Sequence, residues 1–447
     1  MAFRCFSMLA AHDAQCMPLM GMSALPCCPA VSAAMFAPRL KIITERASNM
    51  FHAAHVEESR RESKPVPGSH GLLYYGRTTV RAGPDGKQTQ PMLQALLKFI
   101  AHAIDILVTG LEHKVSARTP MLSANTDLSE CNRPEYFERP ELFYDRGLAA
   151  PDMKPSNERT RGGIRIFDYE FQSETQSEHA CNDTVTGRVF EARAMHGGAA
   201  APALILMHGW REWGVRTPYH WLLGWILARS GVTCILMTQP YHGSRRPKGT
   251  ADGDLMLNGD LEQTVAAFRQ SVCDVRSLIT WARARYSGPV GVSGFSLGGF
   301  ITGLALCADS RIDFAIPIIA GGDLIRGMWD SVVGRTIIRD FNAAGVTPDM
   351  AEDAWRIITP SSFTPRLSPD RIHYIAGRYD LLIPADNVER IAAQWGVTRV
   401  TWLPCGHVGI FLFARDMIAS MLGFVREVCG APERAGAPAP AAPHRNP

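Results

Sequence analysis

Three separate segments of the chain carry residue types that together can activate a hydroxyl group. The pentapeptide GFSLG places Ser296 between two glycines, GRYD ends at Asp380, and PCGH ends at His407. A serine hydroxyl is a poor nucleophile until a base takes its proton, and the imidazole of histidine titrates near neutral pH. A carboxylate can hold that imidazole in the required tautomer and stabilise its charged form. These residue types predict a nucleophile at Ser296, a base at His407 and an orienting acid at Asp380.

Each of these three residues follows a short apolar run that is typical of a buried strand. The runs cover 290–292, 372–376 and 400–403. An earlier run, 203–207, is followed directly by the tripeptide His208-Gly209-Trp210. In a parallel sheet the carboxyl ends of the strands meet at one edge, where ligands bind. The topology therefore predicts that these side chains converge at that edge.

Other polar residues compete for roles at the same edge. Asp323 follows another predicted strand, so the same strand-end argument makes it the alternative acid. His208 is interpreted as a structural residue that orients its loop, because the serine needs only one base. For His242 and Arg245, contact with a substrate and an exposed position on a loop are both open.

Composition narrows the class of protein. The chain has 447 residues, of which 46% are apolar and 20% are charged, and its net charge is +3. These values fit a globular protein with a substantial core, and the small net charge excludes the basic footprint of a nucleic-acid-binding protein. The eleven cysteines are scattered without metal-ligand spacing, so we expect free thiols in a reducing compartment, in the cytoplasm, and no metal site. A targeting leader at the N-terminus stays open.

Changes of pattern divide the chain into four parts. We expect an unstructured leader over 1–90, an N-terminal helix and a surface linker over 91–162, and an unstructured Ala/Pro-rich tail over 431–447. Between them, 163–430 alternates strand and helix patterns after an antiparallel hairpin. This order predicts an α/β fold with a mostly parallel sheet and helices on both faces. Helical stretches over 323–360 are expected to form a small cap.

The order of these motifs resembles that of the alpha/beta-hydrolase superfamily over 163–430. The residues that carry the resemblance are the His-Gly pair after the third strand, the serine turn GFSLG, the late Asp380 and the late His407. The preceding hairpin and the Gly-x-x-Asp that ends at Asp380 are similar to the dienelactone hydrolase and prolyl-oligopeptidase-like branches. The loop QPYHGSRRP at 239–247 is similar to a branch linked to lipid deacylation. The resemblance implies an alpha/beta-hydrolase fold and a serine hydrolase.

A serine hydrolase also needs backbone donors for the oxyanion that forms in its reaction. We expect the N–H of Leu297 to supply one, because this residue follows the serine and opens a helix. The second donor is Gly209 or Trp210, and the residues leave this choice open. No metal or organic cofactor is implied, because the side chains and the backbone supply the chemistry.

The favoured function is hydrolysis of a carboxylic ester, of a small molecule or a lipid, through an acyl-serine intermediate. Three alternatives stay open. A lipid acyl hydrolase would lay the apolar-patterned helix over 92–111 on a membrane, although packing of this helix on the main domain is the simpler interpretation. A serine peptidase would need a gating domain, for which 1–160 is too irregular. A non-catalytic binding protein would keep the fold without needing all three residues.

Overall fold

The computed structural model describes residues 89–115, 127–192, 200–212, 214, 217–329 and 334–430. The predicted tail and nearly all of the predicted leader lie outside these residues. The sheet and the site described below lie within the compact unit Gln94–Pro447.

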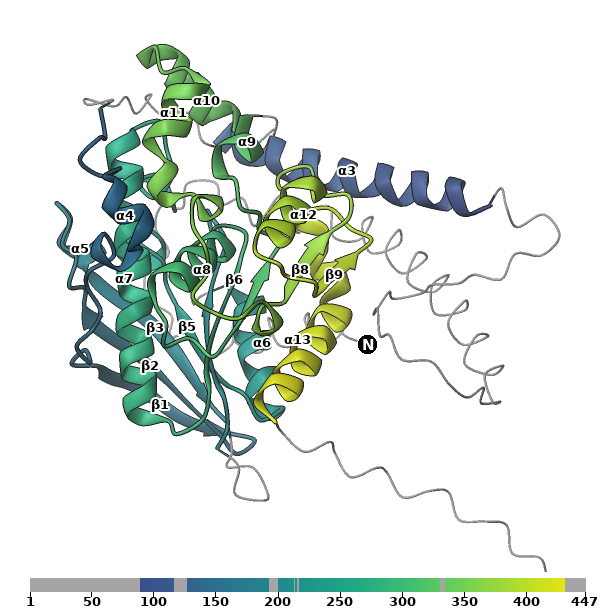
Figure 1. Ribbon diagram of the computed structural model, residues 1–447. Coiled ribbons are helices and arrows are strands. Elements are labelled where there is room, and N and C mark those ends of the chain that lie inside the picture. The colour runs from purple at the N-terminus through teal and green to yellow at the C-terminus, as the bar shows by residue number, and fades with distance from the viewer. Residues whose placement is uncertain are drawn as a thin grey trace, which may run out of the picture. The chain divides into compact units, whose positions relative to one another are not determined.

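A nine-stranded sheet runs through the described residues, in the order β1-β2-β3-β5-β4-β6-β7-β8-β9 (Figure 1). Its antiparallel part consists of β1 (Lys154–Arg161), β2 (Ile164–Gln172) and β3 (Thr184–Glu191), and β3 also pairs antiparallel with β5. The parallel strands are β4 (Ala203–Met207), β5 (Thr233–Met237), β6 (Val290–Phe295), β7 (Phe314–Ile318), β8 (Tyr374–Gly377) and β9 (Val400–Leu403). The prediction of a mostly parallel sheet after an antiparallel start is confirmed.

The edge strand β1 is the one part of this sheet that the sequence does not predict. It lies within the stretch expected to be a linker, and it pairs with β2 from Lys154 to Arg161. All of its residues are exposed. Because no face of β1 is buried, its sequence lacks the alternation of apolar and polar residues that marks a strand.

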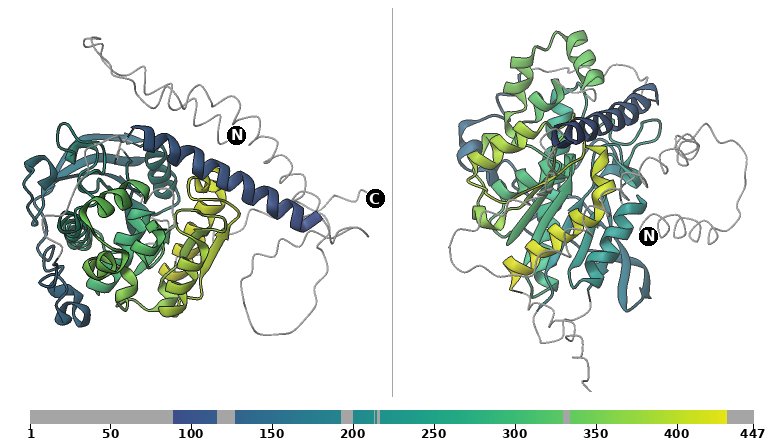
Figure 2. Two further views of the ribbon diagram at one scale, coloured as in Figure 1. Left: turned by 90° about the horizontal axis from the view of Figure 1, so that it is seen from above. Right: turned by 90° about the vertical axis from the view of Figure 1, so that its right-hand side faces the viewer.

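Helices cover both faces of the sheet, as predicted, and Figure 2 shows them from two further directions. One face carries α7 (Leu261–Arg285), α8 (Leu297–Ala308) and α12 (Ala385–Gln394). The other face carries α6 (Pro218–Arg229) and α13 (Ala414–Cys429).

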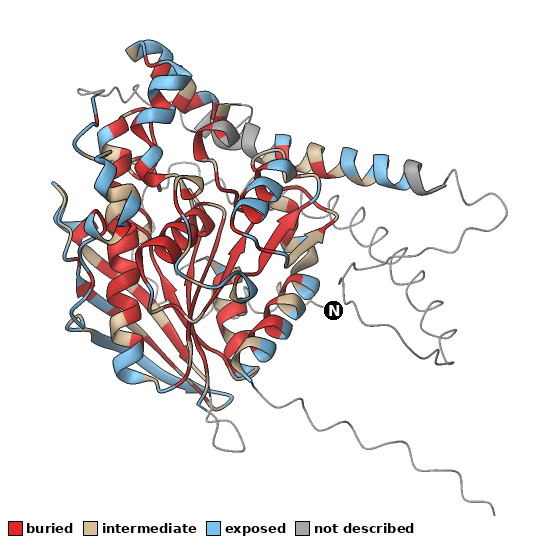
Figure 3. Cartoon of the chain, viewed as in Figure 1, coloured by how far each residue is buried: buried red, intermediate tan, exposed pale blue. Residues whose placement is uncertain are grey.

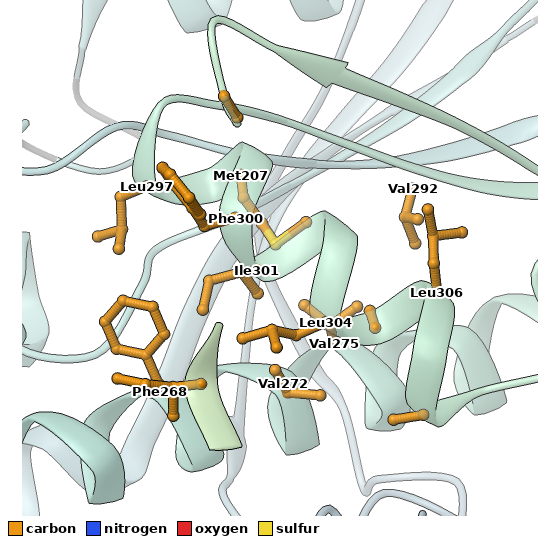
Figure 4. Packing of buried hydrophobic residues seen from close by; sticks show 14 of the residues in the cluster. Met207, Phe268, Val272, Val275, Val292, Leu297, Phe300, Ile301, Leu304 and Leu306 are labelled. Carbon is orange, nitrogen blue, oxygen red and sulfur yellow. The ribbon is translucent and has the colours of Figure 1, made fainter. Parts of the chain in front are cut away.

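Two hydrophobic cores result, one on each side of the sheet. Successive residues of β4 alternate between them, because neighbouring side chains of a strand point to opposite faces. Ile205 and Met207 pack with α7 and α8, whereas Leu204 and Leu206 pack with α6 and α13. Figure 3 shows the buried strands, and Figure 4 shows side chains of α7 and α8 gathered in the first core. The sheet is thus a rigid platform whose strand ends are fixed.

The remaining helices lie around this sandwich. They are α3 (Thr89–Val115), α4 (Pro134–Glu138), α5 (Ala180–Asp183), α9 (Leu324–Trp329), α10 (Arg335–Ala344) and α11 (Pro348–Ala354). Short 3-10 turns span Pro140–Leu142, Gly243–Arg245, Arg356–Ile358, Pro360–Ser362, Pro369–Arg371 and Val408–Phe413. The segment 323–360 is helical as expected, and it is anchored by buried Trp355, whose indole N–H donates to the carbonyl of Leu261 at 3.1 Å. Its role as a cap stays a prediction.

Among the described residues, the helical stretch Val408–Cys429 has the length and composition that would suit a membrane span. Met417, Met421 and Phe424 from this stretch are buried in the core that also contains α6. Packing of α13 on the sheet therefore accounts for the apolar side chains of this stretch that are buried.

Candidate active site

Ser296 lies on a sharp turn between β6 and α8. Its φ is 51° and its ψ is −112°, a conformation that residues with a side chain rarely adopt. The turn is tight, because a Cβ on Gly294 would lie 2.3 Å from the carbonyl carbon of Gly298. The N–H of Ser296 donates to the carbonyl of Ile318 at 2.9 Å. The two glycines thus permit the close approach of strand and helix that holds Ser296 at the strand end.

The side chains of Ser296, His407 and Asp380 form one continuous chain of hydrogen bonds. Oγ of Ser296 lies 2.9 Å from Nε2 of His407, and Nδ1 of His407 lies 2.7 Å from Oδ2 of Asp380. Because an ionised carboxylate only accepts, we assign the ring proton to Nδ1, which leaves Nε2 to accept the serine hydroxyl. The N–H groups of Leu382 and Ile383 donate to Oδ1 of Asp380 at 2.8 and 2.9 Å and fix the carboxylate.

This arrangement can move a proton from a hydroxyl to an imidazole beside a fixed negative charge. His407 is 8% exposed and Asp380 is 6% exposed, while Ser296 is half-buried. Burial of this kind strengthens the interaction between an imidazolium and a carboxylate. Within the described ranges, no group of three or more His, Cys, Asp or Glu side chains is placed to hold a metal ion.

Asp323, the alternative acid, is held by a different partner. Its N–H donates to Oδ1 of Asn387 at 3.0 Å, and its carbonyl accepts from Nδ2 of Asn387 at 2.8 Å. Its side chain lines a surface pocket of about 380 Å³ to which neither Ser296 nor His407 contributes. The geometry therefore favours Asp380 as the partner of the imidazole.

The loop after β4 presents three successive N–H groups near the serine turn. The N–H of Gly209 donates to Oε1 of Glu212 at 3.0 Å, and the N–H of Arg211 donates to Nε2 of His242 at 3.1 Å. For the N–H of Trp210, between them, the described part of the chain shows no acceptor. The sequence allows either Gly209 or Trp210 as the second oxyanion donor. Because the N–H of Gly209 is engaged by Glu212, the N–H of Trp210 is the one available.

The N-terminus of α8 lies directly against this loop. A Cβ on Gly298 would meet the carbonyl oxygen of Met207 at 2.7 Å and that of His208 at 2.8 Å. The N–H of Leu297, in the first turn of α8, likewise shows no acceptor among the described residues. Two backbone donors, at Leu297 and Trp210, are thus left unused where the strand ends meet.

His208 supports the loop from behind and is neutral. Its Nε2 accepts from the N–H of Gln239 at 2.9 Å, so its Nδ1 carries the proton and donates to the carbonyl of Gly209 at 2.7 Å. Burial lowers the pKa of His208 to about 4. These contacts agree with the predicted structural role of His208 in orienting the loop.

His242 and Arg245 are both fully buried, so the alternative of an exposed loop position is wrong for both. Arg245 pairs with Asp274 at 2.9 Å and donates to the carbonyl of Asn182 at 2.8 Å. Burial lowers the pKa of His242 well below its ordinary value. The segment 239–247 therefore lies inside the protein, where His242 accepts the N–H of Arg211 and supports the loop that carries Trp210. No local pattern in the sequence indicates this contact.

Asp105 contacts the loops of both His407 and Asp380, although the sequence analysis does not include it in the site. It lies on α3, is 1% exposed, and accepts the N–H of His407 at 2.9 Å. The only sign of Asp105 in the sequence is that one carboxylate stands among the apolar positions of a predicted helix. That signal marks a buried charge and gives no indication of a partner 302 residues away.

The chain is similar to a described protein family and to several known proteins. Residues 218–325, which include the Ser296 turn, match the family described as "Alpha/beta hydrolase domain containing 18". The uncharacterized protein MT2702 of Mycobacterium tuberculosis is 30% identical over 393 residues, which cover 82% of this chain and 92% of that protein. The uncharacterized protein YdjC of Bacillus subtilis is 26% identical over 112 residues, or 25% of this chain and 97% of that protein.

Among solved structures, acetyl xylan esterase 1 from a Thermoanaerobacterium species is 16% identical, with a TM-score of 0.49. The similarity covers 68% of this chain and 95% of that one. The sheet order and the family match over 218–325 show an alpha/beta-hydrolase fold, and the relationship along most of both chains shows that this chain belongs to the same family as MT2702.

Proposed function

We propose that the protein is a serine hydrolase that cleaves a carboxylic ester through an acyl-serine intermediate. The observation that supports this proposal most is the hydrogen-bond chain from Ser296 through His407 to Asp380, at 2.9 and 2.7 Å. In the first step His407 takes the proton of Ser296 as its Oγ attacks the ester carbonyl carbon. Asp380 stabilises the resulting imidazolium. His407 then gives the proton to the leaving alcohol, and the acyl group stays on Ser296.

Water completes the reaction by the same route. His407 takes a proton from the water as the water oxygen attacks the acyl carbon, and it returns the proton to Oγ of Ser296 as the carboxylic acid leaves. In both steps the carbonyl oxygen becomes an oxyanion. We assign its donors to the N–H groups of Leu297 and Trp210, because the N–H of Gly209 is engaged by Glu212. Loss of one such donor typically costs about 3 kcal/mol of transition-state stabilisation.

Turnover of p-nitrophenyl esters of graded acyl chain length tests this proposal. Ser296→Ala should lower kcat by about 10⁴-fold or more, because the nucleophile is lost. Ser293→Ala is the matched control, since its buried hydroxyl donates to the carbonyl of Ile316 within the sheet. The control should keep the rate of the unmodified protein per folded molecule. Equal activity of Ser296→Ala, or no hydrolysis of any ester by the unmodified protein, contradicts the proposal.

A feature of α3 favours a second candidate function, a lipid acyl hydrolase at a membrane surface. Leu96, Phe99, Ile106 and Leu107 lie on one side of this helix, and each is more than half exposed, with Phe99 at 71%. An apolar helix face of this kind can lie in the interface of a bilayer.

Co-sedimentation of the full-length protein with phosphatidylcholine vesicles tests this candidate. Phe99→Glu should lower the sedimented fraction and leave turnover of p-nitrophenyl acetate unchanged. Lys98→Glu adds a negative charge at the neighbouring position and should leave the sedimented fraction unchanged. Equal sedimentation of Phe99→Glu and the unmodified protein contradicts a membrane role for this face.

A further inference from the structure

We propose that Asp105 is a positioning residue for the hydrolase site, an inference that rests on the serine-hydrolase function proposed above. Asp105 lies on α3, the long helix that passes the arrowheads of β8 and β9 in Figure 1. Its carboxylate accepts hydrogen bonds from the backbone of the loop after β9, which carries His407. It also accepts from the loop after β8, which carries Asp380.

The contacts of Asp105 tie these two loops to one side chain. Its Oδ2 accepts the N–H of His407 at 2.9 Å and that of Leu381 at 3.3 Å, and its Oδ1 accepts the N–H of Val408 at 3.0 Å. The packing is close, because a Cβ on Gly406 would lie 2.4 Å from Oδ2. One carboxylate therefore holds His407, the residue that follows it and the residue that follows Asp380.

The carboxyl group of Asp105 is buried, so it depends on these contacts. Burial raises the pKa of its carboxyl, the N–H of His407 opposes this rise, and the neighbouring charge of Asp380 adds to it. A buried carboxylate destabilises a fold unless donors compensate for its lost hydration. The turn Val408–Phe413 starts here, so its first N–H groups lack acceptors within the turn. Asp105 supplies those acceptors and fixes where the turn begins.

Fixing both loops sets the distance between the imidazole and its carboxylate. Proton transfer depends on this alignment, whereas binding of the ester depends on the pocket around it. Loss of Asp105 should therefore slow the chemical step and leave substrate binding nearly unchanged. Its role is exerted through His407 and Asp380, and it makes α3 part of the framework of the site.

Kinetics of Asp105→Asn in the full-length protein test this inference. An amide loses at least one acceptor and turns N–H donors toward backbone N–H groups, so kcat should fall by roughly 10- to 100-fold while KM changes by less than about two-fold. The rate is expressed per site titrated with a fluorophosphonate, which removes any unfolded fraction. The matched control is Asp183→Asn, a buried carboxylate on α5 that accepts the N–H of Ser177 at 2.9 Å. Its kcat per site should stay unchanged.

Each outcome decides one of the two proposals. An unchanged kcat per site in folded Asp105→Asn, a change in KM alone, or an equal loss of kcat in Asp183→Asn overturns the positioning role and leaves the proposed function intact. Absence of both ester turnover and labelling in the unmodified protein removes the proposed function instead. If Asp105→Asn does not fold, Gly406→Ala displaces the same carboxylate from the opposite side. It should show the same loss of kcat at constant KM, and unmodified kinetics there overturn the inference.

Discussion

The turn that carries Ser296 and the loop that carries His407 meet at one hydrogen bond, but the chain holds them in place in different ways. The tightness of the serine turn comes from its own sequence, because a side chain on Gly294 would collide with the backbone of Gly298. The histidine loop is held by Asp105, 302 residues earlier in the chain. Local sterics define the first, and a distant buried carboxylate defines the second.

This difference predicts that the two regions fail differently when they are changed. A strained turn forms only together with the strand and helix beside it, so a change there should reduce the stability of the fold. The histidine loop can shift while the sheet stays intact, so a change there should mainly reduce the rate of the chemical step.

The largest expected loss of kcat comes from a change at Asp380, the carboxylate that pairs with His407. Asp380→Asn should lower kcat by about 10⁴-fold, because an amide favours the wrong tautomer of His407 and cannot stabilise its charged form. Asp323→Asn should change kcat by less than about three-fold, since Nδ1 of His407 already pairs with Asp380. Turnover of a p-nitrophenyl ester measures both. The reverse ranking would move the role of the acid to Asp323.

A substitution in the serine turn should mainly lower the free energy of unfolding. Gly294→Ala places a methyl carbon 2.3 Å from the backbone of Gly298, so the free energy of unfolding should fall by about 3 kcal/mol or more. Gly423→Ala on α13, where nothing lies within 4 Å, is the control and should raise the stability by up to about 1 kcal/mol. Urea unfolding at neutral pH measures both changes. Equal stabilities of the two variants would show that the turn is less constrained than its geometry indicates.

The loop that carries Trp210 adds a third kind of support, neutral buried histidines, and this support should weaken in acid. Burial lowers the pKa of His208 to about 4 and that of His220 to about 3. The unfolded chain, with histidine pKa values near 6.5, binds more protons than the folded chain between these values. The free energy of unfolding should therefore fall as the pH falls through this window, by roughly 3 kcal/mol for His208 alone.

Urea unfolding of the unmodified protein and of His208→Gln, at pH 7 and at pH 4, measures this dependence. The decrease in acid should be smaller in the variant, because glutamine does not titrate. Parallel pH profiles of the two proteins would show that His208 does not contribute to the acid sensitivity of the fold.

Much of the sheet could be predicted from the sequence, because buried strands and amphipathic helices leave periodic patterns. The positions of Ser296, Asp380 and His407 follow from motifs at strand ends, and the structure brings these side chains within hydrogen-bonding distance. The strand β1 leaves no pattern, because all of its residues are exposed and none of its side chains joins the core.

Contacts between distant segments could not be predicted from a single sequence. The choice between Gly209 and Trp210 depends on which N–H is engaged, and it is the carboxylate of Glu212 that engages Gly209. The position of Asp105 in a helix is predicted by apolar spacing, whereas its partners are set by how α3 packs on the strand ends. Such contacts depend on the whole fold and leave no local signal.

The proposed mechanism requires that the imidazole of His407 activates the hydroxyl of Ser296. Fluorophosphonate labelling followed by peptide mapping is the decisive test, because the probe phosphonylates an activated serine and the mapped peptide identifies the residue. We expect a single adduct on Ser296 in the unmodified protein and none in Ser296→Ala. An unlabelled native protein, or labelling that persists at full strength in Ser296→Ala, would show that Ser296 is not the activated nucleophile.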